Sequence, residues 1–311
     1  MNASSPIRLG VGLGNGTLGF PPGWVLTRFG ELAEEVGFDQ CWVGDHMSWP
    51  SEVVDPLVLL ASVGARTQRI GLATGVYLLP LRSPASVARS FASLDYISDG
   101  RAILGIGVGG EFEEDFLAAG IPMARRGERA DAQIALLHEL WKGEPVDWSD
   151  DFFNLRNVQV LPRPVQRDIP IIAGGRSEAA LRRAATVADG WMPYLMAPER
   201  IAAGIERMRE FSDRPHRVVA HVFVSLGANR ADARRLAIES LSKQYGQDME
   251  RVVDRCVPVG PADAVAEDLA RLAEAGATDI VLRLIAPPED LLMQLESEAR
   301  VVRETLMKEW T

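Results

Sequence analysis

Short apolar, β-branched runs alternate with polar, amphipathic segments along almost the whole chain. Eight of these runs are continuously apolar, as expected for strands that are buried on both faces of a parallel sheet. They cover residues 7–11, 40–44, 70–76, 102–107, 169–173, 191–195, 218–225 and 279–284. The pattern therefore predicts eight strands.

The segments between the runs have the periodicity of helices. Apolar residues recur three or four positions apart between Val25 and Val36, and Gly37 follows as a stop signal. A regular strand–helix–strand order implies right-handed parallel crossovers. Eight such units predict an α/β fold, a (β/α)8 TIM barrel that forms a single domain over residues 1–311. A doubly wound open sheet is the alternative, and the number of strands and the lack of a linker disfavour it.

Two segments interrupt this order. Residues 145–167 follow the helix predicted at 128–141, and their alternating apolar positions predict a hairpin or an extended flap. The seventh unit carries a second insertion at 244–275, which ends in an extra helix over 261–275. Long connections in a compact domain are often lids or interface elements.

Composition narrows the choice of partners and compartment. The 311 residues (34.0 kDa) include 43 Asp and Glu against 33 Lys and Arg, for a net charge of −10. An acidic chain repels phosphate backbones, so nucleic acid and anionic membranes are poor partners. Two cysteines, Cys41 and Cys256, lack the spacing of a metal site or a disulfide framework. Without an apolar run of about 18 residues or a leader-like N-terminus, we expect a cytoplasmic protein with no metal.

Glycine patterns suggest a dinucleotide site twice, at Gly14, Gly16 and Gly19 and again at Gly105, Gly107 and Gly110. Such a site needs a helix that begins at the third glycine. The first pattern runs instead into Phe-Pro-Pro, and the second runs into an acidic segment that would repel phosphate. Tight turns or close approach of the backbone to a flat group explain these glycines better.

A more convincing phosphate site follows the strand at 169–173. The segment Ala173-Gly174-Gly175-Arg176-Ser177 leaves the strand and opens a helix at Ser177, a favoured N-cap. Free amides and the positive helix end would then face the barrel mouth, and Arg176 adds a guanidinium group suited to phosphate. The alternative is a plain helix cap with a solvated arginine.

His46 is the strongest candidate for proton transfer. It follows Asp45 at the carboxyl end of the second strand, where barrel enzymes place their active sites. A structural role is the alternative. His138 and His216 have no such position, and the facing of His221 cannot be assigned from the sequence. The chain also lacks Walker A, Gly-x-Ser-x-Gly and His-Glu-x-x-His motifs, which argues against nucleotide hydrolysis, esterase and zinc protease chemistry.

Six blocks along the chain resemble the bacterial luciferase-like superfamily of flavin- and deazaflavin-dependent oxidoreductases. The blocks are EEVGFDQCWVGDH (34–46), TGVYLLPLRSP (74–84), SLDYISDGRAILGIGVG (93–109), RGERAD (126–131), IIAGGRSEAALRRAATVADGW (171–191) and VGPADAVAEDL (259–269). The resemblance covers nearly the whole chain and is specific for the superfamily, though not for a substrate.

This resemblance implies a tricyclic cofactor, coenzyme F420 or FMN, across the carboxyl end of the barrel. A cis peptide at Gly75–Val76 would lie behind the cofactor ring, and Asp45 would lie at the edge of the ring. Trp49 would line the substrate side of the site. His46 matches the proton-handling histidine of the superfamily. The implied cofactor-binding residues are Asp45, Gly75, Val76, Gly107, Gly109, Ala173, Gly174, Gly175, Arg176 and Ser177.

One position departs from the superfamily. Many relatives carry Trp directly after the glycine-rich fourth strand, where this chain has Gly110 and then Glu111. A related deazaflavin-dependent sugar-phosphate dehydrogenase has Glu nearby, one position out of register. Glu111 is therefore a second candidate catalytic acid.

These observations predict hydride transfer between F420 and a small organic substrate. The alternatives are an FMN-dependent monooxygenase, which would use oxygen and a separate flavin reductase, and a non-catalytic flavin-binding barrel. The resemblance also implies a homodimer, and the second helix, apolar on nearly all sides from Pro56 to Ala61, agrees with burial. Arg125, Arg126 and Arg129 could join Arg176 in drawing in a phosphate.

Overall fold

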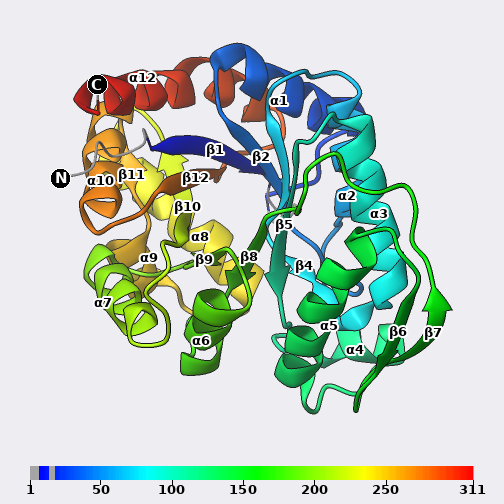
Figure 1. Cartoon of the computed structure of the whole chain (residues 1–311). Coiled ribbons are helices and arrows are strands. Elements are labelled where there is room, and N and C mark those ends of the chain that lie inside the picture. Colours follow the sequence, from blue (N-terminus) through cyan, green and yellow to red (C-terminus); the bar gives the residue numbers. More distant parts are fainter. Residues whose placement is uncertain (1–6, 14–17, 311) are drawn as a thin grey trace.

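The computed structural model describes residues 7–13 and 18–310 and shows a closed barrel (Figure 1). Within those residues, eight parallel strands form a ring in chain order, and β12 pairs with β1 to close it. The strands are β1 (Arg8–Leu13), β2 (Gln40–Val43), β3 (Gly71–Thr74), β5 (Ala102–Gly107), β8 (Ile171–Gly174), β9 (Gly190–Met192), β10 (Arg217–Leu226) and β12 (Asp279–Leu284). The predicted TIM barrel is confirmed and the doubly wound alternative is wrong. Gly14 and Gly16 lie outside the described residues.

Helices surround the strands, with α1 and α12 on one side of the barrel and α6 and α7 on the other (Figure 1). The larger ones are α1 (Gly23–Val36), α2 (Pro56–Gly64), α3 (Pro84–Ile97), α5 (Arg126–Trp141), α6 (Glu178–Thr186), α7 (Pro198–Arg209), α8 (Arg230–Tyr245), α10 (Ala262–Glu274) and α12 (Arg300–Glu309). Asp55 caps α2 by accepting hydrogen bonds from two backbone amides, as the sequence Asp-Pro allows. In the part of the chain described, no helix is both long and apolar enough to cross a membrane.

Both predicted insertions are present. In the first, β6 (Val146–Ser149) and β7 (Asn154–Val158) form an antiparallel hairpin outside the barrel beside α5 (Figure 1). The second contains α9 (Glu250–Cys256), followed by the short strand β11 (Val259–Gly260) and α10. A further helix, α4 (Glu113–Ala119), precedes α5 and was not predicted, because seven residues are too few to show helical periodicity.

Apolar side chains fill the barrel in two layers. Trp42, Ile103, Ile172, Met192 and Val281 are buried together in one cluster inside the ring of strands. A larger cluster lies between the strands and the helices and includes Phe29, Leu60 and Phe91. The interior is thus packed rather than open, which leaves the loops at the carboxyl ends of the strands to form a site.

At the opposite, amino-terminal end of the barrel, the buried carboxylate of Asp279 joins four strands and one loop residue. It accepts hydrogen bonds from Arg8 Nε (2.7 Å) on β1, Gln40 Nε2 (2.8 Å) on β2 and Arg217 Nη2 (2.6 Å) on β10, besides Thr278 Oγ1 (2.7 Å). Burial opposes ionisation, but the hydrogen bonds from Arg8 and Arg217 hold the pKa of Asp279 well below its usual value. The charged form of this side chain therefore stabilises the closure of the ring.

Replacing the carboxylate should test this role. We expect Asp279→Asn to lower the free energy of unfolding by about 3 kcal/mol, the low end for breaking a buried ion pair, because Arg8 stays half exposed. The measurement is urea denaturation at pH 7. Asp254→Asn removes the same charge from an exposed pair with Arg234 and serves as control. Equal losses in the two variants would contradict the role of Asp279.

Candidate active site

A cavity of about 210 Å³ opens at the carboxyl ends of the strands. It is lined by the loops that follow β2, β3, β5, β8 and β9, together with side chains from β10, α8 and β12. Of the predicted site residues, the structure brings together Asp45, His46, Trp49, Gly75, Val76, Gly107, Gly109, Glu111, Gly174 and Gly175 in its lining. Predicted residues from four distant parts of the sequence thus meet at one mouth.

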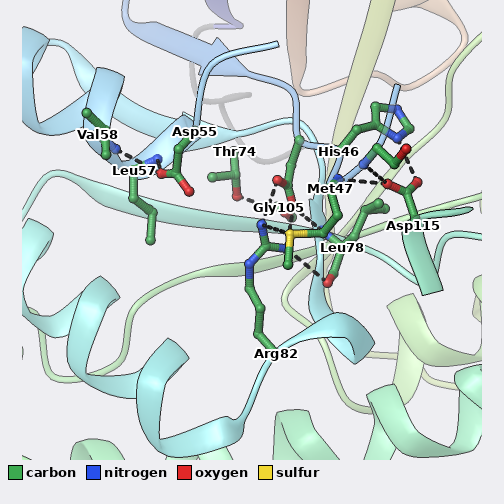
Figure 2. A network of polar contacts seen from close by, with 12 residues as sticks. His46, Met47, Asp55, Leu57, Val58, Thr74, Leu78, Arg82, Gly105 and Asp115 are labelled. Atoms are coloured by element: carbon green, nitrogen blue, oxygen red, sulfur yellow. Dashed lines mark hydrogen bonds and ion pairs between the residues drawn. The ribbon is translucent and has the colours of Figure 1, made fainter. Parts of the chain in front are cut away.

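His46 is held by a buried acidic partner. Its Nδ1 lies 2.9 Å from Oδ2 of Asp115, and Figure 2 shows the two side chains facing each other. The other carboxylate oxygen of Asp115 accepts the backbone amides of Met47 (2.7 Å) and Ser48 (2.8 Å). A carboxylate that already accepts from two amides is best satisfied when Nδ1 of His46 donates to it. Nε2, which has no partner among the described residues, is then the nitrogen available to accept a proton.

Two aromatic side chains fix the imidazole from the side. The ring centroids of His46 and Trp49 are 3.9 Å apart, and Trp49 also packs edge-on against Phe112 at 4.3 Å. Trp49 lines the cavity, and its place on the substrate side stays a prediction. The aromatic contacts restrict the rotation of His46 and exclude water from one of its faces.

The floor of the cavity is built on Val76. The peptide bond between Gly75 and Val76 is cis, as the resemblance implied. A Cβ on Gly107 would lie 2.5 Å from one methyl carbon of Val76, and a Cβ on Gly174 would lie 2.8 Å from the other. Glycine at both positions therefore leaves room for the Val76 side chain beneath the mouth, and this explains Gly107 without a dinucleotide site.

Asp45 lines the cavity, but its carboxylate is engaged elsewhere. Both oxygens accept hydrogen bonds from Arg82, at 2.6 and 2.8 Å, and one also accepts the amide of Leu78 at 2.9 Å. The guanidinium group lies over the ring of Tyr77, 4.1 Å from its centroid. Asp45 thus ties the end of β2 to the segment after β3, and it is not a free acid.

The segment 173–177 has the geometry predicted for a phosphate site. Gly175 adopts a positive φ of 132° between β8 and α6, and Ser177 caps α6 by accepting the amide of Ala180. Among the described residues, the amides of Arg176 and Ser177 donate to no acceptor. Two free amides and a helix N-terminus can hold an anion. Gly174 and Gly175 line the mouth cavity, whereas Arg176 lines an adjoining one.

Glu111 stands at the boundary between these two cavities. It accepts a hydrogen bond from the hydroxyl of Tyr194 at 2.5 Å, and both residues line both cavities, as does Tyr245. Burial raises the pKa of Tyr194 above its usual value and that of Tyr245 to about 12, so both hydroxyl groups are protonated at neutral pH. The guanidinium group of Arg176 packs on the ring of Tyr194, 5.0 Å from its centroid.

Two further basic side chains, His221 on β10 and Arg283 on β12, line the mouth from within the barrel. Burial and the charge of Arg283 lower the pKa of His221 to about 3, so this imidazole is neutral under all ordinary conditions. Arg283 packs over the ring of Phe223, 4.8 Å from its centroid. The sequence pattern did not show which way the side chain of either residue points.

The cluster Arg125, Arg126 and Arg129 lies apart from the described lining of both cavities. Arg125 pairs with Glu128 and Asp151. Arg126 and Arg129 donate to the carbonyl groups of Gly109 and Pro80. These arginines support loops around the mouth. The described residues also contain no group of three or more His, Cys, Asp or Glu placed to hold a metal ion.

The fold and the composition of the mouth agree with one known family. A family model described as luciferase-like monooxygenase matches residues 5–279. The chain belongs to the luciferase-like monooxygenase family. The predicted resemblance is therefore confirmed, and so is the prediction that the protein is an oxidoreductase enzyme.

Relatives in the luciferase-like family differ in the reactions their names describe. An F420-dependent glucose-6-phosphate dehydrogenase of Kineococcus radiotolerans is 36% identical over 180 residues, 56% of this chain and 52% of that protein. A 4-hydroxyprotoasukamycin monooxygenase of Streptomyces nodosus subsp. asukaensis is 37% identical over 153 residues, 47% of this chain and 41% of that protein. The chain thus matches about half the length of each.

Solved structures agree on the fold. The monooxygenase RslO1 from Streptomyces bottropensis superimposes with a TM-score of 0.83 and covers 98% of this chain and 100% of its own. Its sequence identity to this chain is 23%. This likeness supports the barrel fold alone and carries no information about the substrate.

The buried histidine makes stability depend on pH. Because the pKa of His221 is about 3 when folded and about 6.5 when unfolded, the unfolded chain binds a proton that the folded chain does not. Stability is therefore lost as the pH falls below 6.5, by about 2 kcal/mol at pH 5. His221→Gln should show a smaller loss between pH 7.5 and pH 5 in urea denaturation. His138→Gln, on outer helix α5, should behave as the wild type, and an unchanged slope for His221→Gln would refute the assignment.

Proposed function

We propose that this enzyme transfers a hydride between a small organic substrate and the deazaflavin coenzyme F420. The observation that carries the proposal is the His46–Asp115 pair, whose Nδ1 contact leaves Nε2 free to accept a proton at the mouth. Oxidation of an alcohol by hydride loss also releases the hydroxyl proton, and a positioned imidazole is suited to take it. Similarity to the Kineococcus dehydrogenase supports the choice of F420.

The residues of the mouth fit such a cofactor. Gly107 and Gly174 leave Val76 as an apolar floor, and the free amides of Arg176 and Ser177 suit a phosphate. When bound, the deazaflavin supplies the carbon that accepts or gives up the hydride. The protein orients the reactants and excludes water.

His46 and Asp115 divide the work of proton transfer. His46 takes the substrate proton at Nε2, and the resulting imidazolium is stabilised by the carboxylate of Asp115 at Nδ1. Trp49 keeps the imidazole plane in place. Glu111 is a second acid at the outer edge of the mouth, where Tyr194 holds its carboxylate.

An FMN-dependent monooxygenase is the second candidate, and similarity to the Streptomyces nodosus enzyme favours it. In that case the protein depends on oxygen and on a separate flavin reductase. The same floor and phosphate segment would hold FMN, so the choice between the two cofactors requires an experiment.

Cofactor titration tests the proposed function directly. We expect the purified enzyme to bind F420 more tightly than FMN in an absorbance or fluorescence titration, and we expect turnover to continue without oxygen. Tighter binding of FMN together with loss of turnover under anaerobic conditions would favour the monooxygenase. Failure to bind either cofactor would refute both candidates.

Substitution of the proton-handling pair tests the mechanism. We expect His46→Gln to lower kcat at least tenfold, about 1.4 kcal/mol of barrier, with little change in cofactor affinity. Asp115→Asn should cause a similar loss and change the pH profile of kcat, because the amide group can donate to Nδ1 and so favour the wrong tautomer of His46. Both effects are measured by steady-state kinetics.

Glu114→Gln is the matched control, since Glu114 is an exposed acid on the same turn of α4 as Asp115. We expect it to keep the wild-type kcat and pH profile. Unchanged turnover in His46→Gln would remove this residue from the reaction. A loss in Asp115→Asn with an unaltered pH profile would reduce Asp115 to a structural residue.

The homodimer implied by the resemblance stays a prediction. Most of α2 is packed against the barrel, but Val58 on its outer side is 68% exposed and so is available for contact with a second subunit. Light scattering at micromolar concentration would measure the mass, and 34.0 kDa would contradict the dimer.

A further inference from the structure

A second cavity, of about 860 Å³, adjoins the mouth and is unusually rich in arginine. Its walls come from the N-termini of α6 and α7, from α9 and from the last part of α10. The five arginines that line it are Arg176, Arg200, Arg251, Arg255 and Arg271. The lining contains two carboxylates, Glu111 and Glu199. Glu111 already accepts a hydrogen bond from the hydroxyl of Tyr194. We call this space the arginine cavity.

Most of these guanidinium groups have no acidic partner. In the described part of the chain, no carboxylate lies within 4.0 Å of Arg176, Arg200, Arg251 or Arg255, and Arg271 has only a 3.4 Å pair with Asp268. Elsewhere on the surface, arginines such as Arg207 and Arg234 each contact two acids. Four unpaired positive charges around one cavity repel one another, and a bound anion would relieve that repulsion.

The position of the arginine cavity links it to the mouth. Glu111, Tyr194 and Tyr245 line both spaces, and Arg176 directly follows the phosphate segment at Gly174 and Gly175. A ligand in the mouth can therefore extend past these residues toward the arginines. The first turn of α7, with Arg200, adds the positive end of a 12-residue helix to the same wall.

We propose that the arginine cavity binds a multiply charged oxyanion, a phosphate or a group of carboxylates, carried by a ligand that also occupies the mouth. The proposal extends the proposed function, because the ligand is either the cofactor or the substrate. One source is the oligoglutamate chain that F420 carries beyond its phosphate and that FMN lacks. The other is an anionic group on the substrate.

Cys256 offers a direct readout that does not require activity. It lines the arginine cavity and is only partly buried, whereas Cys41, the other cysteine, is fully buried. Alkylation by neutral iodoacetamide therefore reports on Cys256. In the protein without cofactor, we expect saturating citrate or inorganic phosphate to slow this alkylation about fivefold or more, as occupancy of the cavity becomes nearly complete. Roughly 0.5 M NaCl should remove most of the protection by screening.

Charge-removing variants identify the site. Protection is measured as the alkylation rate of Cys256 without citrate divided by the rate with citrate, in the same variant. The double variant Arg200→Gln/Arg255→Gln should lose this protection. The double variant Arg207→Gln/Arg209→Gln removes the same two charges from α7 outside the cavity and should keep the wild-type ratio. Absence of protection by citrate and phosphate in the wild type would overturn the proposal, whether or not F420 binds, so its failure is distinct from failure of the proposed function.

Two further measurements distinguish the sources. If the cofactor tail occupies the cavity, F420 with several glutamates should bind about tenfold more tightly than F420 with one, and the double variant should abolish the difference. If the substrate occupies it, tail length should have no effect, and glucose 6-phosphate should protect Cys256 in the cofactor-loaded enzyme but not in the double variant.

Discussion

Closure of the barrel at Asp279 is the constraint on which the rest of the structure depends. A ring of eight strands can bring its loops to one mouth only if the last strand pairs with the first. The buried carboxylate of Asp279 joins β12 to Arg8, Gln40 and Arg217 on the other three strands at this seam. The charge is placed at the amino-terminal end of the barrel, far along the strands from the carboxyl-end loops, so stability and chemistry occupy opposite ends.

Much of this architecture could be predicted from the sequence, because it depends on local periodicity. The continuous apolar runs placed all eight strands, and the Gly-Gly-Arg-Ser segment placed the start of α6. Asp115 could not be predicted: in the sequence it is one acid in a run with Glu111, Glu113 and Glu114, which is typical of a solvated surface. Only tertiary packing of the short helix α4 brings that one carboxylate to His46.

The arginine cavity was missed for a related reason. Its arginines come from four separate helical regions, and each alone is spaced like an ordinary surface residue. The sequence did raise the need for a local basic site in an acidic chain, and it named Arg176, which lines the arginine cavity, together with Arg125, Arg126 and Arg129, which do not. Arg125 pairs with Glu128, and Arg126 and Arg129 donate to backbone carbonyl groups, whereas four arginines of the arginine cavity have no acidic partner among the described residues.

The two cavities together imply how binding and chemistry are coupled. The His46–Asp115 pair and Val76 line the mouth, whereas the arginine cavity adjoins it at Glu111 and Tyr194. A charged group bound there contributes affinity away from the reacting atoms. Binding of this distant group can orient the ligand so that its reacting carbon lies near Nε2 of His46. Interactions outside the reacting centre can in this way lower the entropic cost of orienting the reactants. Tyr194 contacts both Glu111 and Arg176, so it directly joins the acid at the outer edge of the mouth to the arginine cavity.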